Sequence, residues 1–164
     1  MRPIFIDFEA SSLAPDSWPI EIGLACLEAL EVHLASRLIR PDPGWSPDTW
    51  SLASTAVHGI PRTALDVAKH AANVARWAIA MIRHRTPVSD APAFDQRWLG
   101  CLLATEPSLA RPVIVDFDAA AARRFRRPAL VRVYERLDHL PTPHRAEADA
   151  RRLAHAWLAG SRSV

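Results

Sequence analysis

Residues 3–9 (PIFIDFE) constrain the fold most, because two acids interrupt an otherwise apolar run. The β-branched and aromatic side chains of this run predict a buried strand at the centre of a sheet. Successive side chains on a strand point to opposite faces, so Asp7 and Glu9 share one face. An ionised carboxylate is costly there unless it is paired, so this face must either open to solvent or hold a counter-charge.

The rest of the chain predicts a single α/β domain with a mixed five-stranded sheet flanked by helices. Further strands are expected over residues 20–27, 30–39 and 112–117, and a short one is expected to begin at Pro87. Helices are expected over residues 47–56, 65–82, 93–104, 118–140 (interrupted by Pro128) and 146–159. Thr63 and Asp66 predict a capping box at the start of the second helix. The domain is expected to span residues 1–160, with residues 161–164 as a flexible tail.

The composition and the cysteine pattern argue against an exported or membrane protein. No apolar run approaches the length of a membrane span, so no membrane partner is expected. Asp7 and Glu9 fall where a signal peptide needs unbroken apolar residues. Cys26 and Cys101 have no CxxC spacing, which favours free thiols in a reducing compartment over a disulfide or a zinc site. The sequence therefore predicts a cytoplasmic protein.

Two of the expected helices each carry an acid on their apolar face. Asp95 shares the stripe of Trp98 and Leu99 on the helix over residues 93–104. Asp149 shares the face of Ala150 on the last helix, so it also points inward. Taken alone, Asp95 is explained as a capping residue, and Asp149 as half of a salt bridge with an arginine.

Three separate elements thus direct four acids toward the core, where they would repel one another without a cation. Hard carboxylate oxygens suit Mg²⁺ or Mn²⁺, and not Zn²⁺, which prefers histidine and cysteine. Four carboxylates can hold two ions about 3.5–4 Å apart, an arrangement that clamps the attacking and leaving oxygens in phosphoryl displacement. His144, on the loop entering the last helix, would then be the general base for the attacking water. A lone histidine in this place is also explained as a cap or a surface residue.

The segment from Ala121 to Arg136 is strongly basic, with six arginines against the single acid Glu135. Such a run is either a solvated helix face or a surface that contacts phosphates. Trp18 and Trp45 fall in or near loops, where they could stack on bases.

The ordered set of these residues resembles the DEDDh branch of the DnaQ-like 3′–5′ exonucleases, which have a ribonuclease H-like fold. The first motif, D-x-E, is residues 7–9 (DFE), and the second lies in residues 94–99 (FDQRWL). The third, H-x-A-x-x-D, is residues 144–149 (HRAEAD). Residues 57–60 (VHGI) match a segment that many members carry between the first two motifs. The order and spacing of the motifs extend over nearly the whole chain.

This resemblance implies roles for particular residues. Two Mg²⁺ or Mn²⁺ ions would be bound by Asp7, Glu9, Asp95 and Asp149. His144 would activate the water, and the 3′-terminal nucleotide would leave as a 5′-monophosphate. The implied substrate-binding residues are Ser11, Ser12, Leu13 and His58, with Leu13 packing on the terminal base. His58 has a second explanation, as the residue that ends a short helix before Gly59.

The sequence departs from the family at two places. Residues 10–12 (ASS) replace the usual Thr-Thr-Gly, which changes the hydroxyl and backbone groups available there. Asp90 and Ala91 replace a His-Asn pair before the second motif, so the polar contacts of that pair are not carried over. Asp90 is a fifth acid near the site, either a support for the metal ligands or a strand-end cap.

The resemblance predicts a metal-dependent 3′–5′ exonuclease that acts on single-stranded RNA or DNA or on short oligonucleotides. The alternative is a catalytically idle nucleic-acid-binding or scaffold module on the same fold. A third interpretation is that the acids are structural and the arginines form ordinary surface. The sequence does not distinguish RNA from DNA, or a monomer from a homodimer.

Overall fold

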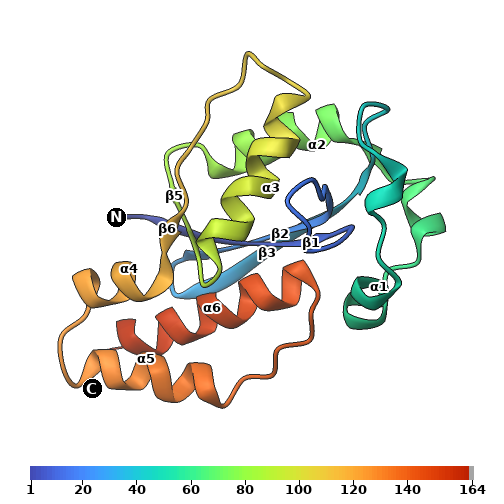
Figure 1. Ribbon diagram of the computed structural model, residues 1–164. Coiled ribbons are helices and arrows are strands. Elements are labelled where there is room, and N and C mark those ends of the chain that lie inside the picture. The colour runs from blue at the N-terminus through green and yellow to red at the C-terminus, as the bar shows by residue number, and fades with distance from the viewer. Residues whose placement is uncertain (163–164) are drawn as a thin grey trace.

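The computed structural model describes residues 1–162, which form one six-stranded mixed sheet with helices on both faces (Figure 1). β1 (Pro3–Ala10), β2 (Pro19–Glu28) and β3 (Glu31–Arg40) make an antiparallel meander. β5 (Thr86–Ser89) pairs with β1 in parallel, and β4 (Lys69–His70) and β6 (Val115–Asp116) are the two edge strands. The strand order is β4-β3-β2-β1-β5-β6, so β1 lies inside the sheet, as predicted.

The sheet has six strands instead of the predicted five, because β4 is an additional short strand. Its two residues pair with Ile39 and Arg40 at the end of β3. The predicted capping box is also wrong. Residues Arg62–Leu65 form the short 3-10 turn η2, and the helix begins only at Ala71. β4 was not predicted because a strand of two residues has no hydrophobic alternation and so gives no periodic signal in the sequence.

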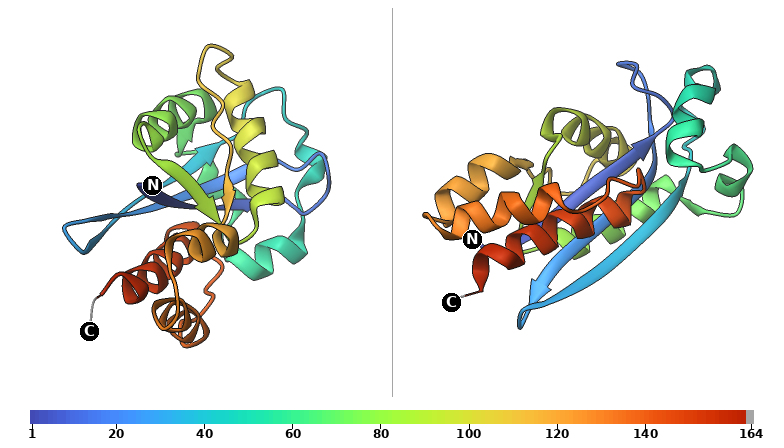
Figure 2. Two further views of the ribbon diagram at one scale, coloured as in Figure 1. Left: turned by 90° about the vertical axis from the view of Figure 1, so that its left-hand side faces the viewer. Right: turned by 90° about the horizontal axis from the view of Figure 1, so that it is seen from below.

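Helices form one layer on each face of the sheet (Figures 1 and 2). α2 (Ala71–Ile82) and α3 (Pro92–Ala104) cover one face. The other face is covered by α5 (Ala129–Asp138) and α6 (Ala146–Ser161), with α4 (Phe117–Arg124) at one end. This is the predicted arrangement of an α/β sheet flanked by helices.

Side chains along β1 alternate between the two faces of the sheet, so alternate residues contact the helices on opposite faces. Ile6 and Phe8 belong to the core cluster under α2 and α3. Phe5 belongs to the cluster on the opposite face, where it packs against α6. Asp7 and Glu9 have the same parity as Phe5, so both acids lie on the face that α6 covers.

α1 (Leu52–His58) follows the 3-10 turn η1 (Pro47–Thr49) and adjoins a cluster of tryptophans. α1 ends at Gly59, whose φ of 68° is in the left-handed region that glycine adopts readily. Trp18 is buried and stacks on Trp45, with ring centroids 5.8 Å apart. Base stacking by Trp18 is therefore excluded, because its ring is part of the core.

The C-terminal half follows the prediction with shorter elements. β6 does not cover all of residues 112–117, because Pro112 has no N–H and the N–H of Ile114 donates to Gln96 at 2.8 Å. Pro128 separates α4 from α5, as predicted. α6 continues to Ser161, and the last two residues of the predicted tail, 163 and 164, lie outside the described residues.

None of the helices within residues 1–162 combines the length and hydropathy needed to cross a membrane.

Candidate active site

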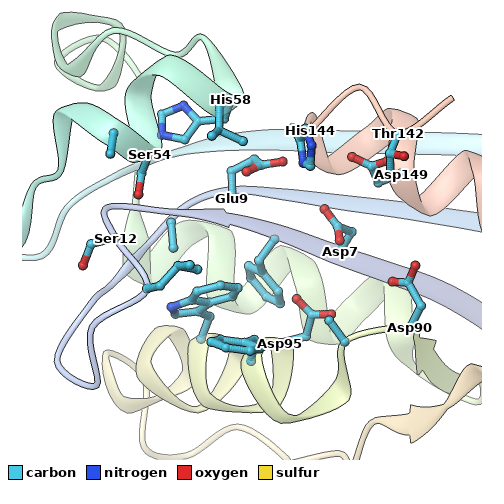
Figure 3. A pocket seen from close by; sticks show the side chains of 18 residues that line it. Asp7, Glu9, Ser12, Ser54, His58, Asp90, Asp95, Thr142, His144 and Asp149 are labelled. Atoms are coloured by element: carbon cyan, nitrogen blue, oxygen red, sulfur yellow. The ribbon is translucent and has the colours of Figure 1, made fainter.

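A cavity of about 540 Å³ lies between the end of β1, α1, the first turn of α3 and the start of α6 (Figure 3). Its lining includes all five predicted catalytic residues, Asp7, Glu9, Asp95, His144 and Asp149. Of the predicted substrate-binding residues, Ser12, Leu13 and His58 line it, and Ser11 does not. The fold thus brings the predicted motifs from both ends of the chain to one place.

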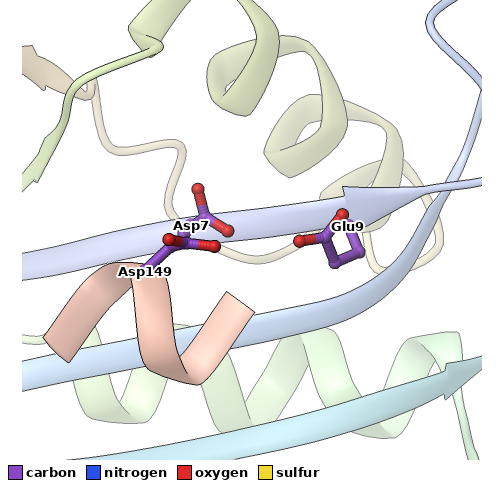
Figure 4. Close-up of side chains that lie close together, drawn as sticks. All are labelled: Asp7, Glu9 and Asp149. Carbon is purple, nitrogen blue, oxygen red and sulfur yellow. The ribbon is translucent and has the colours of Figure 1, made fainter. Parts of the chain in front are cut away.

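Asp7, Glu9 and Asp149 form an acidic group in which one carboxylate oxygen from each lies within 4.8 Å of the others (Figure 4). Asp7 and Glu9 reach this place from one face of β1. Asp149 comes from the first turn of α6, which lies over that face. The prediction that Asp149 points inward with Ala150 is confirmed, since both residues are buried.

Asp95 faces the same cavity from the first turn of α3 but stands apart from the group of three (Figure 3). It is 1% exposed, and the hydroxyl of Ser89 donates to its Oδ2. β5 ends at Ser89 and pairs with β1 only over residues 3–5, so α3 begins beside the part of β1 that β5 leaves free. The inward orientation predicted for Asp95 is therefore confirmed.

Burial raises the pKa of all four acids, and the charges of nearby acids add to the rise. The pKa of Glu9 rises to about 8, first through burial and then through the nearby charge of Asp149. Burial raises the pKa of Asp95 to about 7, although the hydrogen bond from Ser89 opposes the rise. Burial, followed by the charges of Asp95 and Glu9, raises the pKa of Asp7 well above its ordinary value. Burial also raises the pKa of Asp149. Acids that suppress one another's ionisation form a site that a cation stabilises.

The arginines close to the cavity pair with other acids. Arg145 donates to Glu21 at 2.7 Å, and Arg152 donates to Asp90 at 3.1 Å. Within residues 1–162, no lysine or arginine forms an ion pair with any of the four acids. The salt bridge considered for Asp149 is therefore wrong, and its Oδ1 is buried without a hydrogen-bond partner. A buried, unpartnered carboxylate oxygen among other acids fits a hard divalent cation.

His144 lies on the loop before α6, at the rim of the cavity beside Asp149 (Figure 3). Its φ of 52° is in the left-handed region, which is uncommon for a residue other than glycine. The N-cap of α6 is Arg145, so His144 does not cap this helix. The side chain is exposed, so a proton on its imidazole exchanges with solvent. A histidine in this position is suited to accept a proton from water.

His58 is 4% exposed and lines the cavity from the end of α1. Its Nδ1 accepts a hydrogen bond from the backbone N–H of Ile60 at 3.0 Å, across the turn at Gly59. Its Nε2 is buried without a hydrogen-bond partner. Its ring meets that of Trp50 edge-on. Both explanations of His58 are therefore compatible, because one ring nitrogen stabilises the helix end and the other remains free.

The loop after β1 divides the three predicted substrate-binding residues between two roles. Ser11 is buried, and its hydroxyl accepts from the backbone N–H of Trp18 at 3.1 Å. The side chain of Ser11 holds the loop together and does not line the cavity, and its substrate contact stays a prediction. Ser12 lines the cavity and accepts from the N–H of Ala14 at 3.2 Å. Leu13 also lines the cavity and is 69% exposed.

Two of the residues that the sequence analysis did not single out matter most for the arrangement of the site. Glu21 on β2 is buried and anchors Arg145, next to His144. A single acid inside the apolar run of residues 20–27 was the available signal. Phe94 is a partly exposed aromatic side chain on the cavity wall, with its ring centroid 5.6 Å from that of Trp98. It belongs to the second motif, but the sequence gives no indication that its ring faces open space.

Comparisons with known proteins establish the fold. No protein-family model matches the chain, and no curated protein matches its sequence. The nuclease domain of 3′hExo, a DEDDh family member bound to rAMP, is similar with a TM-score of 0.69 and 17% identity, over 95% of this chain and 89% of that chain. Exonuclease I of E. coli in complex with a dA16 oligonucleotide has a TM-score of 0.69 and 17% identity, over 98% of this chain but only 41% of that chain.

Exonuclease X in complex with 5′ overhanging duplex DNA is also similar, with a TM-score of 0.61 and 18% identity, over 95% of this chain and 89% of that chain. The chain therefore has the α/β fold of these nucleases. The resemblance to DEDDh exonucleases, drawn from three short motifs, is confirmed at the level of the fold.

Proposed function

We propose that this protein is a metal-dependent 3′–5′ exonuclease that hydrolyses single-stranded nucleic acid or short oligonucleotides to 5′-mononucleotides. The observation that carries the proposal is the acidic group of Asp7, Glu9 and Asp149. These carboxylates face one another in a cavity, and within residues 1–162 no basic side chain forms an ion pair with them. A purely structural set of acids would be expected to have such partners.

We assign two Mg²⁺ or Mn²⁺ ions to Asp7, Glu9, Asp95 and Asp149. The donor set consists only of carboxylate oxygens, which suits these hard cations. When bound, such ions polarise phosphoryl oxygens and lower the pKa of a bound water. The protein holds the ligands in place through neighbouring groups, because Ser89 donates to Asp95 and the N–H of Arg145 donates to Asp149.

His144 is the proposed general base. As the water oxygen attacks the terminal phosphorus, His144 takes a proton from that water, and the bond from phosphorus to the 3′ oxygen breaks. The leaving 3′ oxygen takes a proton from solvent water, so the shortened strand ends in a 3′ hydroxyl, and the released nucleotide keeps the phosphate at its 5′ position. The exposed ring of His144 then returns its proton to solvent.

The remaining walls of the cavity suit a terminal nucleoside. Leu13, Val57 and Phe94 add exposed apolar surface to the cavity wall, on which a base can pack. His58 adds one unpartnered ring nitrogen to an otherwise apolar region. We propose that Leu13 and His58 contact the terminal nucleotide, together with Ser12.

The similar structures support the proposed classes of substrate and product. The 3′hExo domain is bound to rAMP, and Exonuclease I is in complex with dA16. A mononucleotide and an oligonucleotide are thus bound by proteins of this fold. Another protein of similar structure is a 3′-exonuclease, which supports hydrolysis from the 3′ end.

The proposal is tested with RNA and DNA strands that are labelled at the 5′ end and incubated with Mg²⁺ or Mn²⁺. We expect a ladder of shortened strands that keep the label, together with 5′-mononucleotides identified by chromatography. EDTA and Asp7→Asn should abolish the ladder, whereas Asp138→Asn, at an exposed acid of α5, should not. Tight binding with intact ends would instead favour the idle nucleic-acid-binding module.

A further inference from the structure

The start of α6 rests on the residues of β2 that lie directly opposite the acids of β1. In the β1–β2 register, Asp7 is paired with Gly23 and Glu9 with Glu21. Paired residues on adjacent strands have side chains on the same face of the sheet. Glu21 and Gly23 therefore occupy the same face as Asp7 and Glu9, one strand further across.

Glu21 is bound to the start of α6 by three hydrogen bonds. Its Oε1 accepts from Nη2 of Arg145 at 2.7 Å, and its Oε2 accepts from Nε of the same side chain at 3.0 Å. Oε2 also accepts from the backbone N–H of Ala146 at 3.1 Å. Glu21 is only 4% exposed, so its carboxylate is shielded from water, although the side chain of Arg145 is 49% exposed. A bidentate pair of this kind fixes orientation as well as distance.

These bonds replace a cap that the helix itself does not provide. The N-cap residue of α6 is Arg145, whose side chain has no acceptor for the free N–H groups of the first turn. Glu21 accepts one of these N–H groups from outside the helix. Asp149 accepts the N–H of Arg145 through Oδ2 at 3.1 Å, which leaves Oδ1 facing the other acids. Arg145 is thus the residue through which Glu21 and Asp149 are connected.

Gly23 and Ser36 also hold the first turn of α6 against the sheet. A Cβ atom added to Gly23 would lie 2.0–2.3 Å from backbone atoms of Ala146 and Glu147, so only glycine allows the helix to come this close. Ser36 on β3 is paired with Gly23 in the β2–β3 register, and its hydroxyl donates to Glu147 at 2.8 Å. The first turn of α6 is therefore fixed on a row of residues that continues from Asp7 across three strands.

We infer that Glu21 is a positioning residue, which holds Arg145 and Ala146 so that Asp149 and His144 meet the acids of β1. This inference rests on the proposed function, since it assigns the positioning to the metal ligands and the general base. Both oxygens of Glu21 are occupied by Arg145, so Glu21 acts through its neighbours and not as a ligand.

The test compares Glu21→Gln and Glu21→Ala in the full-length protein. Glu21→Gln keeps the shape and one acceptor for Ala146, whereas Glu21→Ala removes all three bonds. The matched control is Glu28→Gln, on the same strand, which breaks a peripheral pair with Arg85. Three quantities are measured: Mn²⁺ affinity by calorimetry without substrate, kcat and KM on a short oligonucleotide, and amide hydrogen exchange over residues 145–149.

We expect Mn²⁺ affinity and kcat to fall about 10- to 100-fold in Glu21→Ala, as for other groups that orient metal ligands, and less in Glu21→Gln. KM should change little, and exchange over residues 145–149 should be faster than in Glu28→Gln. Unchanged Mn²⁺ affinity, kcat and exchange in both variants would overturn the inference. The loss of one bound ion with unchanged exchange would also overturn it, because Glu21 would then be a ligand.

The positioning role and the nuclease proposal can fail separately. If the wild-type protein neither binds Mn²⁺ nor shortens any strand, the proposed function fails. Faster exchange at the start of α6 in Glu21→Gln than in Glu28→Gln would still support the positioning of this turn by Glu21. If the wild-type protein is active and neither Glu21 variant alters exchange or kcat, only the positioning role is overturned.

Discussion

The backbone N–H of Ile60 donates to Nδ1 of His58, and this bond determines what the other ring nitrogen can do. Burial lowers the pKa of His58, which favours a neutral ring. A neutral imidazole that accepts at Nδ1 carries its proton on Nε2. Because Nε2 is buried without a partner in a residue that lines the cavity, His58 has one N–H donor available for the nucleotide contact that we propose.

The variant His58→Asn tests this role. Asparagine can still accept from the N–H of Ile60 with its side-chain oxygen, but it does not extend to the position of Nε2. We expect KM to rise about tenfold, as for the loss of a hydrogen bond to a charged group, while kcat changes little. Steady-state kinetics on a short oligonucleotide checks this, with the exposed His33→Asn on β3 as the control. Equal KM values in the two variants would show that His58 serves only the helix end.

The variant His144→Gln should separate chemistry from binding. A general base acts in the chemical step, so we expect kcat to fall by about 10²–10⁴ with little change in KM. Mn²⁺ affinity, measured by calorimetry, should be unchanged because the four acids remain. His139→Gln, at the exposed end of α5, is the control. Equal losses in kcat and in substrate affinity would count against this role.

The variant Asp149→Asn distinguishes a metal ligand from a structural acid. Asparagine still accepts the N–H of Arg145 but removes one of the repelling charges. In EDTA we expect the thermal midpoint to stay the same or rise, and the stabilisation by Mn²⁺ to disappear. The value of kcat/KM should fall on the order of 1000-fold, since bound ions contribute several kcal/mol to such reactions. A lower midpoint in EDTA with normal stabilisation by Mn²⁺ would identify a structural role.

The acids of the site could be located from the sequence because their signal is local. Asp7 and Glu9 interrupt an apolar strand, and the two-residue period of a strand gives them one face. Asp95 and Asp149 interrupt apolar helix faces in the same way, and both are buried in the structure. The prediction that these four acids meet at one site followed because buried carboxylates need a counter-charge, which one shared group of cations can supply.

The remaining features depend on contacts between distant segments, which leave little local signal. β4 exists because two residues meet the end of β3, not because of their own pattern. Ser11 is adjacent to the cavity residue Ser12 in sequence, but a bond to Trp18 turns its hydroxyl away from the site. Glu21 stands out as an acid in an apolar strand, but its partner Arg145 lies more than half the chain away.

The basic segment 121–136 should not affect hydrolysis of the shortest substrates. Arg123, Arg124, Arg126 and Arg127 are exposed and lie on α4 and in the turn before α5, at the end of the molecule opposite α1 (Figure 1). We therefore expect kcat/KM for a dinucleotide to be unchanged when Arg123, Arg124, Arg126 and Arg127 are all replaced by glutamine. On a long single strand, the slope of log affinity against log salt falls by about 0.7 for each phosphate that the variant no longer neutralises. An unchanged slope would identify these arginines as ordinary solvated surface, whereas slower cleavage of the dinucleotide would contradict the expectation.

The raised pKa values of the acids predict how pH acts on the protein in the absence of metal. The pKa of Glu9 rises from 4.5 to about 8, and that of Asp95 from 3.8 to about 7. A carboxyl whose pKa is higher in the folded state binds more protons when folded, so it stabilises the fold at low pH. This stabilisation is present below the unfolded-state pKa values and is lost as pH rises through about 7 and 8.

We therefore expect the thermal midpoint in EDTA to fall by several degrees between about pH 5 and pH 8.5, since 1 kcal/mol corresponds to about 2–4 °C in a domain of this size. Saturating Mg²⁺ or Mn²⁺ should largely remove the fall, because ligands that bind the ionised acids stabilise the folded state by mass action. Differential scanning calorimetry across this range checks both parts. The double variant Asp7→Asn and Glu9→Gln is the control, in which the fall should be smaller and the metal should have little effect. A midpoint in EDTA that rises with pH across this range would show that the acids are neutralised within the protein, and the metal assignment would then lose its physical basis.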